Sequence, residues 1–186
     1  MRKCIFGAAA AAVFGLSAAA SAVVVYDEAV DGDLSGDQSA PTSIVFSLGS
    51  NEIVANIAGG GFERDVFSFV VPAGLQIDSL VLTQYDSGAG NTTLLQGSIG
   101  ADATTDDLGN ITLNSTAVGA ELLDGFQVQL TDTGFPATLG EGTYSFDLVE
   151  AASVDYTLDF NLAVVPEPAS LGLLSVAGLG LLRRRK

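Results

Sequence analysis

Carboxylates are the side chains of this sequence most clearly placed to do chemistry, because the chain has 22 Asp and Glu residues but no His. They are densest in residues 27–37, where four aspartates are interleaved with glycines: Asp27, Asp31, Asp33 and Asp37. Ca²⁺ takes about six to eight oxygen ligands, and closely spaced Asp residues with Gly between them can wrap a hard cation. These four residues are therefore predicted to form a weak calcium site. The alternative is a solvated acidic linker, because the segment completes no EF-hand loop.

The same inventory excludes most catalytic classes. Without His the chain cannot form a Ser-His-Asp site, a Cys-His site or a His-ligated zinc centre. Lys occurs only at positions 3 and 186, which excludes a phosphate-binding loop with a Lys between the two ends. Paired carboxylates of the glycosidase type stay open, although a close pair is expected by chance among so many acids. We expect no enzyme, with a carboxylate-dependent glycosidase as the most distant alternative.

A polysaccharide-binding module is the nearer alternative. Sugar rings commonly stack on Trp or Tyr, but the chain has no Trp and only Tyr26, Tyr85, Tyr144 and Tyr156. Alternating patterns place Tyr144 and Tyr156 on buried faces. Only Tyr26 and Tyr85 are left as candidates for a binding platform.

The N-terminus has the pattern of a secretory signal peptide. A basic opening at residues 1–3 precedes an apolar run at 5–16, and Ala20-Ser21-Ala22 supplies the small residues of a cleavage site. We expect signal peptidase to act on residues 1–22 during export and to leave Val23 as the first residue. Cys4 lies before the apolar run, so it is not placed as a lipid anchor, and its removal leaves a mature chain without disulfide or thiol chemistry.

Three different segments follow one another at the C-terminus. Pro166-Glu167-Pro168 precedes an uncharged run at residues 169–182, and four cations end the chain: Arg183, Arg184, Arg185 and Lys186. As a helix the run would reach only about 21 Å, against a hydrocarbon core of about 30 Å. Cationic side chains can snorkel and bilayers thin around short spans. We therefore predict a short transmembrane helix, with a buried core helix as the alternative.

This ending resembles the PEP-CTERM sorting signal of bacterial exported proteins. The match consists of Val165, Pro166, Glu167 and Pro168, then the span at residues 169–182 and the basic cluster at 183–186. The resemblance implies processing by the membrane-embedded enzyme exosortase, in bacteria that make extracellular polysaccharide. It implies an inner-membrane intermediate and a final place at the cell surface or outside the cell, and nothing about the chemistry of the sorted domain.

The part of the chain between the two ends is strongly acidic. Six of the seven basic residues and one of the 22 acids lie outside residues 23–165, which leaves Arg64 against 21 acids and a formal charge of −20. Such a field repels nucleic acid and anionic lipid headgroups. No nucleic-acid partner is expected.

Strict alternation of apolar and polar residues indicates strands. It is clearest in residues 126–131, 143–148 and 154–162, and weaker in 43–48, 52–57, 65–71, 76–85, 93–99 and 110–113. A period of two places one set of side chains in a core and the other in water, which is typical of half-exposed antiparallel strands. The sequence predicts an all-β antiparallel sandwich, jelly-roll or immunoglobulin-like, at residues 42–165. An acidic segment at 23–41 precedes it, and the sorting signal at 166–186 follows.

A second resemblance covers residues 43–162. Asp65-Val66-Phe67-Ser68-Phe69, the turn Ala73-Gly74, and Gly142-Thr143-Tyr144 with the closing strand Tyr156-Thr157-Leu158 look like motifs of bacterial pre-peptidase C-terminal domains. That resemblance implies a calcium-associated β-sandwich. Such domains usually accompany the catalytic domain of a secreted enzyme, and we expect this chain to depart from that pattern, because the strands between residues 43 and 162 leave no room for one. We therefore expect an exported, non-catalytic sandwich sorted to the envelope or polysaccharide matrix.

The acidic segment generates a testable prediction about calcium. An extracellular site of this kind has a dissociation constant of about 10⁻⁴–10⁻³ M. At about 10 mM calcium, linkage then predicts about 1.4–2.7 kcal/mol of added stability. Thermal melts at constant ionic strength should show a larger upward shift with calcium than with sodium, and Asp31→Asn with Asp33→Asn should remove the difference. An undiminished calcium effect in that double variant would leave only a solvated acidic linker.

Overall fold

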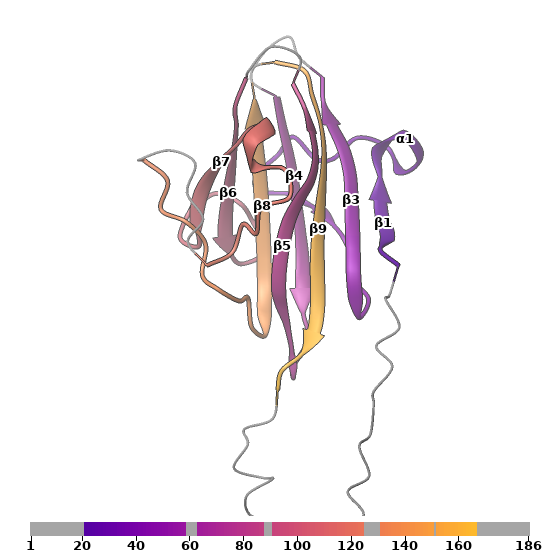
Figure 1. Ribbon diagram of the computed structural model, residues 1–186, viewed down its shortest axis with the longest axis vertical. Coiled ribbons are helices and arrows are strands. Elements are labelled where there is room, and N and C mark those ends of the chain that lie inside the picture. Colours follow the sequence, from indigo (N-terminus) through magenta and orange to yellow (C-terminus); the bar gives the residue numbers. More distant parts are fainter. Residues whose placement is uncertain (1–20, 59–62, 88–90, 125–130, 151, 167–186) are drawn as a thin grey trace, which may run out of the picture.

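The computed structural model describes residues 21–58, 63–87, 91–124, 131–150 and 152–166 of the chain. Within them lie nine strands, one short α-helix and one 3₁₀ helix (Figure 1). In chain order these are β1 (Val23–Asp27), α1 (Glu28–Asp31), β2 (Thr42–Ser43), β3 (Gly49–Ile57), β4 (Glu63–Val71), β5 (Leu75–Asp86), β6 (Thr93–Ile99), β7 (Gly109–Leu113), η1 (Ser115–Ala117), β8 (Gly142–Glu150) and β9 (Val154–Val164).

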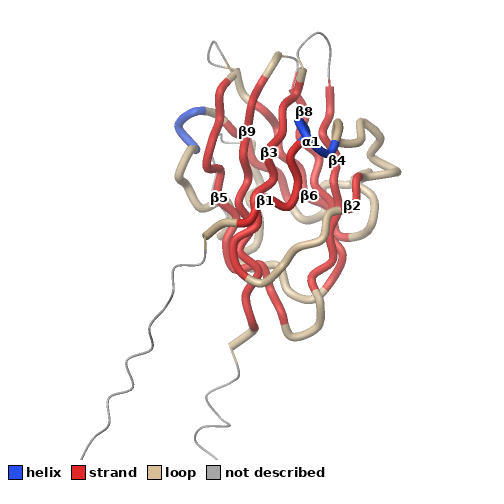
Figure 2. The backbone as a smooth tube through the Cα atoms, turned by 90° about the vertical axis from the view of Figure 1, so that its right-hand side faces the viewer, coloured by secondary structure: helices blue, strands red, loops and turns tan. Residues whose placement is uncertain are grey.

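The strands form two sheets that lie face to face (Figures 1 and 2). One sheet has the order β1-β3-β9-β5 and the other has the order β2-β4-β8-β6-β7. The chain changes sheet between all consecutive strands except from β6 to β7 and from β7 to β8. The two layers therefore share one core, as the alternating patterns predict.

Two edges of the sheets differ from the predicted antiparallel arrangement. β1 runs parallel to β3, and β2 runs parallel to β4, so both sheets are mixed. A hairpin can only produce antiparallel neighbours, whereas parallel neighbours need a longer crossover. Each of these short strands is followed by such a crossover before its partner begins, and the prediction of purely antiparallel sheets is wrong at these two edges.

Most predicted strands are present with nearly the expected bounds. The exception among the described residues is 43–48, where only Thr42–Ser43 pairs with β4 before the chain crosses to the other sheet. The acidic segment 23–41 contributes β1 and α1 to the fold. The predicted strand at 126–131 lies almost wholly outside the described residues.

The two predicted flanking helices also lie outside the described residues, apart from Ser21 and Ala22 at the end of the signal segment. They stay predictions. In the part of the chain that is described, no helix is both long and apolar enough to cross a membrane.

Aromatic rings fill the centre of the core. Phe67 and Phe146 lie on neighbouring strands of one sheet with ring centroids 5.8 Å apart, and Phe69 meets Phe160 of the other sheet at 5.3 Å. All four rings are at most 1% exposed. Burying one such side chain contributes about 1.5–3 kcal/mol, so this cluster holds the two sheets together. Tyr144 and Tyr156 are also buried, as their alternation predicts.

The outer face of the β2-β4-β8-β6-β7 sheet carries an ion pair whose acid is buried and whose base is partly exposed. Arg64, the single base between residues 23 and 165, pairs with Asp147, whose side chain is 1% exposed. Gln38 Nε2 donates to the same Asp147 oxygen at 2.7 Å and to the carbonyl of Ala103 at 3.0 Å. Burial raises the pKa of Asp147, and Arg64 and Gln38 act in the opposite direction. Through Gln38, Asp147 thus ties the loops around residues 38 and 103 to the sheet.

Removing this cation should destabilise the domain. Arg64→Met removes the cation paired with the buried Asp147 carboxylate and leaves the Gln38 amide as its hydrogen-bond donor, so we expect a loss of about 1–3 kcal/mol in the free energy of unfolding. The loss is smaller than for a fully buried pair because the Arg64 side chain is 34% exposed. Urea unfolding at neutral pH measures it. Combining Arg64→Met with Asp147→Asn should restore part of the stability, and an Arg64→Met variant as stable as the parent would contradict the role.

Candidate functional site

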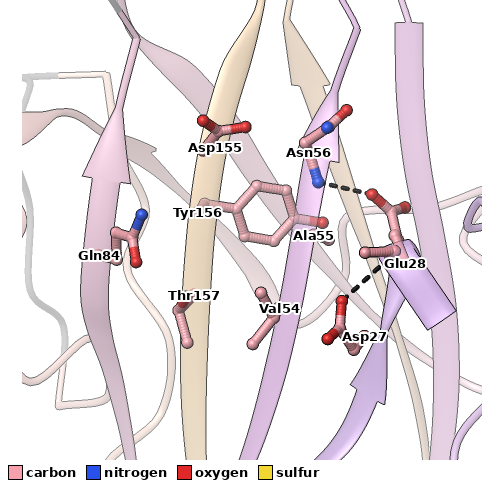
Figure 3. Close-up of a pocket in the computed structure, with 10 residues that line it drawn as sticks. Asp27, Glu28, Val54, Ala55, Asn56, Gln84, Asp155, Tyr156 and Thr157 are labelled. Atoms are coloured by element: carbon pink, nitrogen blue, oxygen red, sulfur yellow. Dashed lines mark hydrogen bonds between the residues drawn. The ribbon is translucent and has the colours of Figure 1, made fainter.

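The predicted calcium ligands are distributed over a short turn rather than gathered around one point. Asp27 ends β1 and caps α1, where its Oδ1 accepts the Ala29 N–H at 3.0 Å (Figure 3). Asp31 Oδ2 accepts the Asp27 N–H at 2.9 Å. Asp37 Oδ1 accepts both the N–H and the hydroxyl of Ser39, at 2.9 and 2.7 Å. Three of the four carboxylates therefore already stabilise local turns.

The fourth ligand, Asp33, belongs to a different cluster of carboxylates. Asp33, Glu28 of α1 and Asp65 of β4 each offer an oxygen, and these oxygens lie within 4.8 Å of one another. Asp33 is exposed, Glu28 is half-buried and Asp65 is buried. Spacing along the sequence does not single out Glu28 or Asp65 as ligands. The sequence does indicate that Asp65 is buried, because it occupies an inward position in the alternation that continues with Phe67 and Phe69.

Asp65 is joined to the opposite sheet. The Tyr156 hydroxyl donates to Asp65 Oδ2 at 2.9 Å, and both residues are 1% exposed. Burial raises the pKa of Asp65 to about 8, the negative charge of Glu28 adds to the rise, and the Tyr156 hydrogen bond opposes it. At neutral pH the Asp65 carboxyl therefore holds a proton, and any cation bound by the cluster has to displace that proton.

Glu28 fastens the N-terminal segment to the edge of a sheet. Its Oε2 accepts the Asn56 N–H of β3 at 2.5 Å (Figure 3), and its Oε1 accepts the Leu34 N–H at 2.9 Å. Burial raises the pKa of Glu28, while these two backbone hydrogen bonds lower it. Both oxygens thus have a structural task, and Glu28 holds α1, the following loop and β3 together.

The hollows beside this cluster are small. A pocket of about 190 Å³ is lined by Asp27, Glu28, Ala29, Val54, Ala55, Asn56, Gln84, Asp155, Tyr156 and Thr157 (Figure 3). A second hollow, of about 300 Å³, is lined by Glu28, Ala29, Asp33, Asn56, Ala58 and Glu63. Pockets for drug-sized ligands span about 300–1,000 Å³. Both hollows lie at or below the lower limit of that range.

Neither candidate tyrosine is fully exposed. Tyr85 is 8% exposed, and its hydroxyl lies 2.9 Å from the hydroxyl of Thr93. Tyr26 is partly buried against the core, and its hydroxyl donates to the Gly32 carbonyl at 2.8 Å. All four tyrosines of the chain lie within the described residues, and none of them is exposed.

The sorting motif continues directly from β9. This strand ends at Val164, the Val165 N–H donates to the Gly74 carbonyl at 3.0 Å, and Pro166 is exposed. Glu167, Pro168 and residues 169–186 lie outside the described part. The first two residues of the predicted motif are thus placed at the end of a strand in the middle of a sheet.

Comparison with known proteins agrees with this placement. The model of the PEP-CTERM protein-sorting motif matches residues 164–186, which include every residue predicted for the motif. No curated protein matches the chain. A crystal structure of PliG, a periplasmic inhibitor of g-type lysozyme from Salmonella Typhimurium, is similar over 65% of this chain and 97% of that chain, with 14% identity and a TM-score of 0.34. A likeness at this level supports no argument about function.

The molecule is therefore a mostly β protein of two mixed sheets. It carries a PEP-CTERM protein-sorting motif at its C-terminus, which marks it as an exported protein directed to exosortase. The calcium ligands and the resemblance to pre-peptidase C-terminal domains stay predictions.

The raised pKa of Asp65 predicts how stability depends on pH. Unfolded Asp titrates near 3.8, so between that value and about 8 the folded chain binds one more proton than the unfolded chain. The stability from Asp65 is fully present below about pH 4 and is lost as the pH rises through 8. When the pH is raised from 5 to 7, the parent should therefore lose about 2–3 kcal/mol of its free energy of unfolding through Asp65, and Asp65→Asn should not show this loss.

Urea unfolding of both proteins at the two pH values measures this difference. Glu141→Gln, at an exposed position, is the matched control and should follow the parent. An Asp65→Asn variant whose stability changes with pH as the parent's does would show that Asp65 ionises normally in the folded state.

Proposed function

We propose that this chain is an exported, non-catalytic β-sandwich protein, sorted by its PEP-CTERM tail to the cell envelope or the extracellular polysaccharide matrix. The observation that carries the proposal is the sorting motif at residues 164–186, which continues from the last strand of a folded domain. In the membrane-bound intermediate, residues 169–182 span the inner membrane and the basic cluster stays cytoplasmic. Exosortase then processes the tail, and the domain reaches the surface.

Strand order supports a jelly-roll rather than an immunoglobulin-like sandwich. The order β3-β9-β5 faces the order β4-β8-β6-β7, and the chain alternates between the sheets from β3 to β6 and again from β8 to β9, as in a jelly-roll built from two Greek keys. In an eight-stranded jelly-roll one more strand would lie beside β5. Residues 119–122 and 139 occupy that edge, with hydrogen bonds to Leu82, Leu80 and Ile77.

The site geometry supports a non-catalytic role. In a retaining glycosidase two carboxyl groups lie about 5–5.5 Å apart and flank a bound sugar. The oxygens of Glu28, Asp33 and Asp65 are close enough, but Asp65 is 1% exposed and its Oδ2 is engaged by Tyr156. Asp65 lines neither of the adjoining hollows, so a sugar held in them would not lie between Asp65 and the other two carboxylates.

Binding of matrix polysaccharide is the second candidate and has less support. A stacking platform needs an exposed aromatic face. Tyr85 is 8% exposed, and Tyr26 is packed against the core. If the domain contacts matrix polysaccharide, the contact relies on polar groups and cations rather than on stacked rings.

Changes confined to the tail test the sorting function. Replacing residues 183–186 with Ser removes the charges that hold the cytoplasmic end, and replacing residues 166–168 with Ala removes the recognition motif. Both variants should fold as the parent does but fail to reach the surface fraction. Cell fractionation with immunoblotting measures this, and circular dichroism of the purified variants checks the fold.

Thr138→Ala, at an exposed position outside the tail, is the control and should be sorted normally. Normal surface delivery of both tail variants would contradict the proposed sorting.

A further inference from the structure

Six exposed apolar side chains gather at one end of the domain. Each of them lies at or next to the end of a strand: Val23 in β1, Leu48 before β3, Val70 in β4, Ile99 in β6, Val164 in β9 and Val165 after β9. Their exposed fractions run from 41 to 63%. We call these six residues the apolar rim. They include most of the large hydrophobic residues exposed in the described part of the chain.

Strand register shows that the rim lies at a single end. Val164 pairs with Leu75 at the start of β5, and Gly49, next to Leu48, pairs with Leu162. On the other sheet Val71 pairs with Gly142, and Ile99 pairs with the nearby Tyr144. β1 and β9 both reach this end, where the chain enters and leaves the domain (Figure 1).

The opposite end is acidic. It carries the cluster of Glu28, Asp33 and Asp65, and further carboxylates near strand ends: Glu63, Asp86, Glu150 and Asp155. The rim end also has carboxylates, among them Glu141 before β8 and Asp107, which accepts the Ile99 N–H at 3.3 Å. The domain is thus polarised, with apolar side chains toward the tail and the carboxylate cluster away from it.

The length of the tail limits how far the rim can lie from the membrane. Only residues 166–168 separate Val165 from the predicted span. Three extended residues reach at most about 11 Å. A bilayer of about 40–45 Å has a hydrocarbon core of about 30 Å, so each headgroup layer is about 5–8 Å thick. The linker is little longer than this layer, and the span has no spare length to extend it.

We propose that in the anchored precursor the apolar rim rests on the lipid surface, with its side chains in the headgroup layer and the acidic end pointing away. This inference rests on the proposed function, because it requires the tail to be inserted. The tether keeps the rim at a high effective concentration at the surface, so contacts too weak to recruit a free domain suffice. Anionic headgroups repel the acidic end and favour the same orientation.

A fluorescence experiment on the full chain tests the orientation. Cys4→Ser leaves a chain without cysteine, so a single new cysteine can carry the environment-sensitive label NBD. Leu48→Cys and Ile99→Cys place the label on the rim, and Ser153→Cys places it at the exposed turn between β8 and β9, at the opposite end. The protein, exported in a host without exosortase, is reconstituted in phosphatidylethanolamine and phosphatidylglycerol vesicles that contain brominated lipids.

We expect bromolipid quenching to be several-fold stronger at positions 48 and 99 than at 153. Equal quenching at all three positions in protein that floats with the vesicles would overturn the rim contact and leave the sorting function intact. Protein that does not float with the vesicles would overturn the membrane-anchored intermediate, and the rim contact with it. Rim labels that become shielded from water only after exosortase is added would show that the rim contacts the enzyme instead of the lipid.

Charged substitutions in the apolar rim are a second, independent test of the same contact. Leu48→Asp combined with Ile99→Asp should reduce quenching of a label at Val70→Cys several-fold without changing flotation, because the tail still anchors the protein. Ser153→Asp is the matched control and should change nothing. Both rim positions are at least 60% exposed, so the fold is expected to tolerate the charges. Unchanged quenching in the double variant would contradict the proposal.

Discussion

The hydrogen bond from Tyr156 to Asp65 joins the two sheets at the end of the domain where the carboxylate cluster lies. At 2.9 Å between two residues that are 1% exposed, it commits a carboxyl group to the core. An ionised carboxylate there would be costly, since Glu28 and Asp33 are close by. The proton on Asp65 lowers this cost. That proton favours the attachment of the N-terminal segment through Glu28, because an ionised Asp65 would repel the Glu28 carboxylate.

A shortage of positive charge shapes the rest of the surface. With Arg64 committed to Asp147, other carboxylates are met by neutral donors. The Ser50 hydroxyl donates to Asp159 at 2.6 Å, and the Asn161 amide donates to Asp78 at 2.7 Å. Such hydrogen bonds hold each carboxylate in place without cancelling its charge. The domain therefore keeps its strong negative field while remaining folded.

Elements with strict local patterns could be predicted from the sequence, and contacts between distant segments could not. β8 and β9 follow from alternation, and the sorting motif follows from the order of its three segments. The parallel partners of β1 and β2 depend on crossovers that leave no periodic signal. The cluster joins Asp33 to Asp65, which lies far away in the sequence. Asp37 is predicted to share a calcium site with Asp33, but its carboxylate accepts a hydrogen bond from Ser39 instead. Spacing along the chain identified an acidic segment, whereas the fold decided which of its carboxylates meet.

The tail leaves the domain from an inner strand of its sheet, and this has a mechanical consequence. β9 lies between β3 and β5 and is paired with both along nearly its whole length. A pull that reaches the domain through residue 166 acts along the axis of β9, so the hydrogen bonds on both sides resist it together. A tether on an edge strand such as β1 would load only one row of bonds. The pairing of β9 thus favours resistance to a pull at the C-terminus over resistance to a pull on an edge strand.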